Sequence, residues 1–152
     1  MPFEALDYVG PTVTPKAKAV PIDGVRVTAQ RLGLKVRGNE PQKFVRYIRI
    51  DIGKKLAKDM ALHGQQLLCS VLFGIGTDAG KIRIAVDATA GRFTAKANKK
   101  GEWFLTINEA TADGLFALEF PTFCVLDIRP HCSDRQPPSI TFSASAEMLE
   151  AD

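Results

Sequence analysis

The chain has few of the residues that most often carry catalysis, with two histidines, three cysteines and one tryptophan among its 152 residues. A hydrolytic triad needs a nucleophile, a base and an orienting acid in one cleft. Ser70 and Ser133 are available nucleophiles, but neither lies in a Gly-x-Ser-x-Gly elbow. The sequence therefore predicts a protein that is not an enzyme.

The cysteines are odd in number and irregularly spaced, which argues against a disulfide framework and favours a cytoplasmic location. A zinc site could be assembled from Cys124, His131 and Cys132, with or without Cys69. Their spacing lacks the paired Cys-x-x-Cys or His-x-x-x-His patterns, however. A free cysteine in an apolar strand usually packs as a small hydrophobic residue, so we expect neither a metal nor another cofactor.

Long hydrophobic runs are also missing. The longest, residues 67–76, has about half the length of a membrane span. The N-terminus lacks the basic and apolar regions of a secretory signal, and we expect no membrane association. The glycine-rich stretch 74–80 lies between two strand-like segments, unlike the glycine loops that hold phosphate at the start of a helix.

Positive charge, in contrast, is concentrated in the first part of the chain. Residues 1–60 contain 12 Lys and Arg against 6 Asp and Glu, whereas residues 61–152 contain 8 against 11. A basic half attracts polyanions, although proteins that bind none can carry one too.

Hydrophobic spacing predicts a mainly β fold. We interpret residues 1–24, which contain four prolines, as an extended arm, 25–146 as a single β-rich domain and 147–152 as a short acidic tail. Within 31–37, Leu32, Leu34 and Val36 alternate with polar or small residues, which predicts a strand with these side chains buried. Further strands are expected at 44–50, 65–74, 81–86, 92–96, 102–107, 123–129 and 139–144, with a loop at 131–138.

Two short helices complete the predicted elements. The first, over 52–62, has apolar residues at i, i+4 and i+8, with Asp51 as its N-cap and Gly64 beyond its end. The second covers 109–118 and has Asn108 as its cap.

The elements occur twice in the same order, which predicts two β-β-α-β-β pseudo-repeats at about 25–87 and 90–146. Residues 60–62 align with 116–118, and residues 82–84 align with 140–142. We expect the two units to form one small barrel or barrel-like sandwich.

The first unit resembles the AbrB/MazE-like swapped-hairpin family, on the segments 47–51, 55–57, 60–62, 67–71 and 81–84. In that family two chains interleave into one small barrel that binds DNA as a transcription factor or antitoxin. The resemblance implies that this chain carries both halves, as a monomer with internal pseudo-symmetry or as a homodimer. The second unit departs from the first, because it is acidic at 109–113 where the first has lysines.

The candidate nucleic-acid contacts are basic and aromatic residues of two predicted strands and the following helix: Arg31, Lys35, Arg37, Arg46, Tyr47, Arg49, Lys54, Lys55 and Lys58. On adjacent elements they would form one cationic surface for phosphates, and arginine can also read guanine edges. The alternative is that these charges only keep an outer face in water and discourage edge pairing.

Two functions agree with this pattern. The first is an AbrB-like transcriptional regulator that binds DNA through the basic face of the first unit. The second is a protein-interaction module that binds no nucleic acid, such as an antitoxin-like protein or an accessory protein of a phage or mobile element.

Overall fold

A computed structural model describes residues 19–34, 38–41, 43–112, 115–133 and 136–149. The strands are β2 (Val25–Leu34), β3 (Lys43–Ile52), β4 (Gln66–Phe73), β5 (Lys81–Val86), β6 (Phe93–Ala97), β7 (Trp103–Asn108), β8 (Phe123–Val125), β9 (His131–Ser133) and β10 (Gln136–Ser143). The helices are α1 (Lys54–Asp59), α2 (Glu109–Ala112) and α3 (Ala146–Leu149), with a 3-10 turn at Gly76–Asp78.

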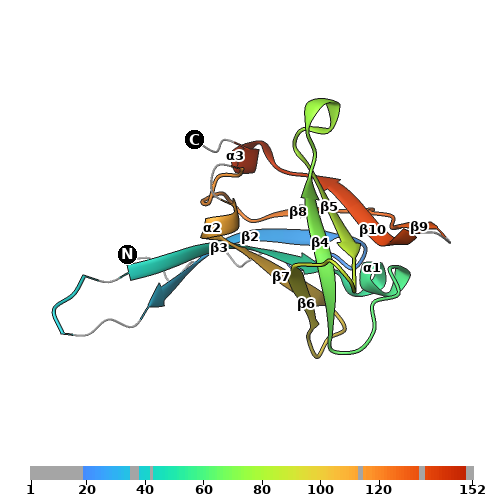
Figure 1. Cartoon of the computed structure of the whole chain (residues 1–152), viewed down its shortest axis with the longest axis horizontal. Helices are drawn as coiled ribbons and strands as arrows, with labels where there is room; N and C mark the ends of the chain where they lie inside the picture. Colours follow the sequence, from blue (N-terminus) through green and yellow to red (C-terminus); the bar gives the residue numbers. More distant parts are fainter. Residues whose placement is uncertain (1–18, 35–37, 42, 113–114, 134–135, 150–152) are drawn as a thin grey trace, which may run out of the picture.

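The nine strands within the described residues join one antiparallel sheet in the order β8-β2-β3-β7-β6-β4-β5-β10-β9. The sheet curls into a half-barrel (Figure 1), which confirms the predicted mainly β, barrel-like fold. Its inner face holds the core. Ile48, Ile50 and Ile52 of β3 point inward at every second position and are almost completely buried. Burying such a side chain contributes about 1.5–3 kcal/mol, so this alternation fixes which face of the strand is inside.

The strand order has a two-fold relation between the predicted units. β3 of the first unit and β7 of the second are neighbours at the centre of this relation. On one side β3 is followed by β2 and then β8; on the other side β7 is followed by β6 and then β4. Ile50 lies opposite Leu105, each four residues before the first residue of α1 or α2. Arg83 lies opposite its sequence equivalent Thr141.

The relation breaks at β8 and β10. Their counterparts β4 and β5 pair with each other, whereas β8 and β10 stand apart in the strand order, with β9 beside β10 at the far edge. Within the described residues the sheet therefore has two free edge strands, β8 and β9, and does not close into a complete barrel.

The β2–β3 hairpin extends beyond its neighbours. β8 pairs with β2 only at residues 25–27, and β7 pairs with β3 only at residues 47–52. Residues 31–34 and 43–46 consequently pair only with each other in the described sheet and form a two-stranded arm that projects from the rest of the molecule (Figure 1). The predicted burial of Leu32 is wrong, because its side chain lies on this arm and is 56% exposed. Val36 lies outside the described residues, and the structure does not place the side chain of Leu34.

The first helix is shorter than predicted, and its predicted cap is wrong. Asp51 still belongs to β3, whereas Gly53 precedes the helix and provides no side-chain cap. Leu56 and Met60 are buried, as the apolar spacing predicts, and Ala57 is buried beside them. The helix ends at Asp59, with Met60 as its C-cap, and Ala61 adopts a positive φ of 58°. Gly64, φ 78°, lies in the turn that follows.

The predicted cap of the second helix is confirmed. Asn108 Oδ1 accepts hydrogen bonds from the backbone N–H and the hydroxyl of Thr111, both at 3.0 Å. The helix itself is only Glu109–Ala112, so the prediction of a helix up to residue 118 is wrong.

The C-terminal part contains more regular structure than predicted. The predicted loop at 131–138 contains β9 and the first residues of β10, while the strand at 123–129 ends at Val125. Residues 147–149 of the predicted tail belong to α3, whose Met148 is completely buried.

Candidate nucleic-acid interface

The outer face of the sheet is strongly basic. We define it as the strand side chains that alternate with the core residues and point away from them. Residues that lie opposite one another on neighbouring strands share this face. Examples are the rows Thr28–Arg49–Thr106 and Leu72–Arg83–Thr141. Among the described residues it carries one carboxylate, Asp51, and six cations: Arg26, Lys43, Arg49, Lys81, Arg83 and Lys96.

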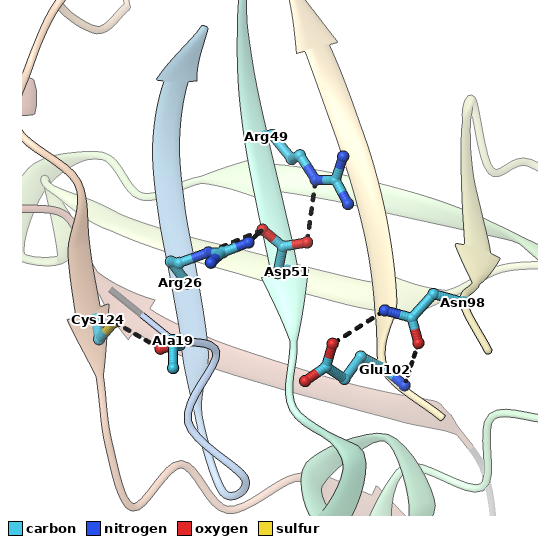
Figure 2. Close-up of polar contacts among 7 residues, drawn as sticks. All are labelled: Ala19, Arg26, Arg49, Asp51, Asn98, Glu102 and Cys124. Carbon is cyan, nitrogen blue, oxygen red and sulfur yellow. Dashed lines mark hydrogen bonds and ion pairs between the residues drawn. The ribbon is translucent and has the colours of Figure 1, made fainter. Parts of the chain in front are cut away.

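Asp51 is held between two arginines. Arg26 Nη2 lies 3.1 Å from one carboxylate oxygen and Arg49 Nε lies 3.0 Å from the other, while the Asp51 side chain is 4% exposed (Figure 2). The guanidinium of Arg49 also lies 4.2 Å from the centre of the Phe104 ring, a cation–π contact. One buried negative charge thus meets two positive charges, and a net positive charge remains on the face.

Arg31 and Arg46 point to the opposite side. They are register partners on the two strands of the arm, on the side continuous with Val27 and Ile48. Arg31 Nη2 lies 2.9 Å from Glu119, and Arg46 Nη2 lies 2.8 Å from Glu109. Carboxylates of the second unit therefore bind two of the predicted DNA contacts.

The electrostatics at Glu109 follow from this pairing. The hydrogen bond from the Arg46 side chain, helped by a weaker one from the Arg46 backbone N–H at 3.4 Å, lowers the pKa of Glu109 below its ordinary value of 4.5. The ion pair is consequently complete at neutral pH.

The other predicted contacts are also dispersed. Tyr47 lies on the outer face, between Gln30 and Asn108 in register. The lysines Lys54, Lys55 and Lys58 are exposed on α1, beyond the end of β3. Since a strand rises about 3.3 Å per residue, α1 begins more than roughly 20 Å from Arg46. The predicted residues Lys35 and Arg37 lie outside the described residues.

One helix lysine does meet a second basic segment. A Cβ atom on Gly101 would lie 3.3 Å from Cγ of Lys54, so this side chain lies over the β6–β7 turn that carries Lys99 and Lys100. Lys96 and Lys99 line one shallow depression beside Gln66. The outer face is thus continuous with a basic turn at one end of β6.

Of the six cations on the outer face, sequence reasoning named only Arg49 as a possible contact. It missed Arg26 and Lys43, and also Lys81, Arg83 and Lys96. The net negative charge of residues 61–152 hid the last three, because the described carboxylates of that half lie mainly in turns and helices. The available signal was the alternation of Lys81 and Arg83 with the core residues Ile82 and Ile84.

The three cysteines lie in different surroundings. Burial raises the pKa of the Cys69 thiol to about 11, and the charge of Asp87 adds to the increase. The thiol of Cys124 lies 3.7 Å from the carbonyl oxygen of Ala19 (Figure 2), and Cys132 is exposed. Within the described ranges no three His, Cys, Asp or Glu side chains gather as metal ligands.

Comparisons with known proteins identify no relative of this chain. No family model matches the chain, and no curated protein or solved structure shows significant similarity to it. No helix in the part of the chain that the structure describes is long and apolar enough to cross a membrane.

Proposed function

We propose that this chain is a non-enzymatic DNA-binding protein that contacts phosphates through the outer face of its sheet. One observation carries the proposal: six cations and a single carboxylate on that face within the described residues, with the carboxylate buried between Arg26 and Arg49. Lysine and arginine release condensed counterions when they neutralise phosphates, and this term dominates non-specific DNA binding.

The neutral residues of the face suit the same ligand. Thr28, Thr94, Thr106 and Thr141 present hydroxyls between the cations, and threonine is among the side chains that commonly donate to phosphate oxygens. Tyr47 adds a phenol hydroxyl on the same side. Arg31 and Arg46 are not part of the proposed contact, because they face Glu119 and Glu109.

A role as an AbrB/MazE-like regulator is the family interpretation that we favour. It is supported by the two-fold strand order, in which one chain supplies both β-β-α-β-β units. A single chain with two related units would present a DNA surface without a second copy. The acidic second unit makes that surface asymmetric, so we expect no strict two-fold reading of the DNA.

A protein-interaction module remains the second candidate, and the β2–β3 arm favours it. Beyond residue 27 of β2 and before residue 47 of β3, the arm has no further strand partner in the described sheet. Exposed strand edges can pair with an extended segment of another protein.

Charge reversal distinguishes the two candidates. Lys96→Glu, in the middle of the outer face, should weaken binding to a mixed-sequence duplex about tenfold or more at low salt, because it replaces an attraction to phosphate with a repulsion. Lys58→Glu on α1 makes the same charge change away from the face and serves as the matched control. Fluorescence anisotropy measures both affinities. Equal losses for both variants would contradict the assigned face, and no DNA binding by the unmodified protein would leave the interaction module.

A further inference from the structure

The outer face is hollowed where β4, β5 and β10 meet. One depression of about 370 Å³ is lined by Leu72, Phe73, Gly74, Ile75, Asp78, Lys81, Arg83 and Thr141. A second, of about 560 Å³, adjoins it through Leu72, Arg83 and Thr141, and includes His131, Pro137 and Ser139. We call the two together the Arg83 depression. Both volumes lie in the range of sites that take small molecules, about 300–1,000 Å³.

Arg83 differs in its bonding from the other arginines of the face. Its Nε donates to Thr141 Oγ1 at 3.1 Å, which orients the guanidinium. Among the described residues no carboxylate forms an ion pair with it, whereas Arg26 and Arg49 share Asp51. Lys81 is paired with Asp78 at 3.2 Å, so among the described residues the positive charge of Arg83 is not compensated by a carboxylate in the depression.

Apolar side chains stand beside this charge. Leu72 is the register partner of Arg83 and is 55% exposed, and Ile75, at the start of the β4–β5 connection, is 85% exposed. Exposed aliphatic groups next to an oriented cation suit a ligand that has an apolar face for the aliphatic groups and a negative charge for the cation. A nucleotide combines these properties, because its base has an apolar face and its phosphate has a charge.

We infer that the Arg83 depression receives an unpaired nucleobase, with Arg83 on its phosphate, so that the protein binds single-stranded DNA more tightly than a perfect duplex. The inference rests on the proposed function and specifies the form of its ligand. In a duplex the bases are stacked, and only their edges are accessible in the grooves, which an inserted helix or two-stranded ribbon can reach. A concave depression within a sheet face instead fits a base that has left the stack.

The test compares three fluorescein-labelled ligands of about 20 nucleotides, long enough to span a single-strand site: a single strand, its perfect duplex, and the duplex with a central unpaired loop. Anisotropy titrations at low and moderate salt use the full chain. We expect the single strand and the looped duplex to bind about tenfold more tightly than the perfect duplex, because a base placed against Leu72 and Ile75 removes apolar surface from water.

Two variants locate the effect. Arg83→Gln should weaken single-strand binding about tenfold, the effect of losing a charge-assisted hydrogen bond, and Ile75→Ser should reduce the preference for unpaired DNA. Matched controls are Arg129→Gln and Leu126→Ser, which change exposed residues outside the sheet. Circular dichroism confirms that each variant is folded.

The outcomes separate the two proposals. A duplex that binds as tightly as the single strand overturns this inference and leaves the proposed function intact. Single-strand preference that survives in both Arg83→Gln and Ile75→Ser overturns the location. If no ligand binds at low salt, the proposed function fails and the inference fails with it.

Discussion

Asp51 shows at the residue scale how the molecule balances charge. A carboxylate directly after a hydrophobic strand resembles a helix cap in the sequence, yet the strand continues through it and its side chain joins Arg26 and Arg49 across the sheet. A carboxylate with so little exposure is tolerated because both of its oxygens have cationic donors. The arginines keep part of their surface in water, where they remain accessible to phosphate.

We predict that Asp51→Asn lowers the free energy of unfolding by about 2–3 kcal/mol, because two arginines then share a site without a negative charge. Urea denaturation measures the change. Asp59→Asn, an exposed carboxylate on α1, is the control and should change stability by less than about 0.5 kcal/mol. Equal stability of the two variants would show that the Arg26–Asp51–Arg49 contact does not stabilise the fold.

The cysteines give a second prediction at this scale. At pH 8 an exposed-thiol reagent should label Cys132 rapidly and Cys69 only after unfolding, because Cys69 is buried and its pKa is raised to about 11. The unfolded thiol ionises near 9.0. The stability contributed by neutral Cys69 is therefore complete below pH 9 and decreases as the pH rises toward 11. Mass spectrometry identifies the labelled residue, and rapid labelling of Cys69 in the folded protein would contradict its burial.

At the scale of elements, the sequence predicted the strands well and their ends poorly. Alternation such as Ile82 and Ile84 between Lys81 and Arg83 identifies a strand with one buried face wherever the strand lies over the core. The same alternation predicts the burial of Leu32 wrongly, because Leu32 lies on the two-stranded arm, beyond the end of the core. The predicted helices are too long. Apolar periodicity shows which side of a helix is buried, but it does not show at which residue the tertiary contacts that stabilise the helix end.

The arm itself is anchored by two exposed ion pairs, Arg31–Glu119 and Arg46–Glu109. We predict that Glu109→Gln increases amide hydrogen exchange at residues 43–46 and leaves the exchange of the central β3 residues unchanged, since the arm lacks neighbouring strands there. Because the pKa of Glu109 is lowered from 4.5, the ion pair should persist at neutral pH and weaken as the pH falls below about 4.5. Hydrogen exchange followed by NMR tests both statements, and unchanged exchange in the variant would contradict the anchoring role.

At the scale of the whole molecule, the predicted repeat has a structural counterpart in the strand order, whereas the described members of the predicted cationic surface lie on different sides of the sheet and on α1. The charge count favours residues 1–60, and the predicted strands and helix place this surface at residues 31–58. The register of nine strands instead gathers cations from both units on one face and turns Arg31 and Arg46 toward carboxylates. Such a face depends on which strands become neighbours, and a single sequence does not contain that information in readable form.

The most direct test of the basic outer face is the salt dependence of DNA binding by the unmodified chain and by Lys96→Glu. If the face neutralises several phosphates, the logarithm of the binding constant should fall linearly with the logarithm of salt concentration, with a slope of about −0.9 per phosphate contacted on duplex DNA and about −0.7 on a single strand. The Lys96→Glu variant should then show a shallower slope by about one contact on the same ligand. A slope near zero, or the same slope in both proteins, would contradict the central claim that this face binds the DNA backbone.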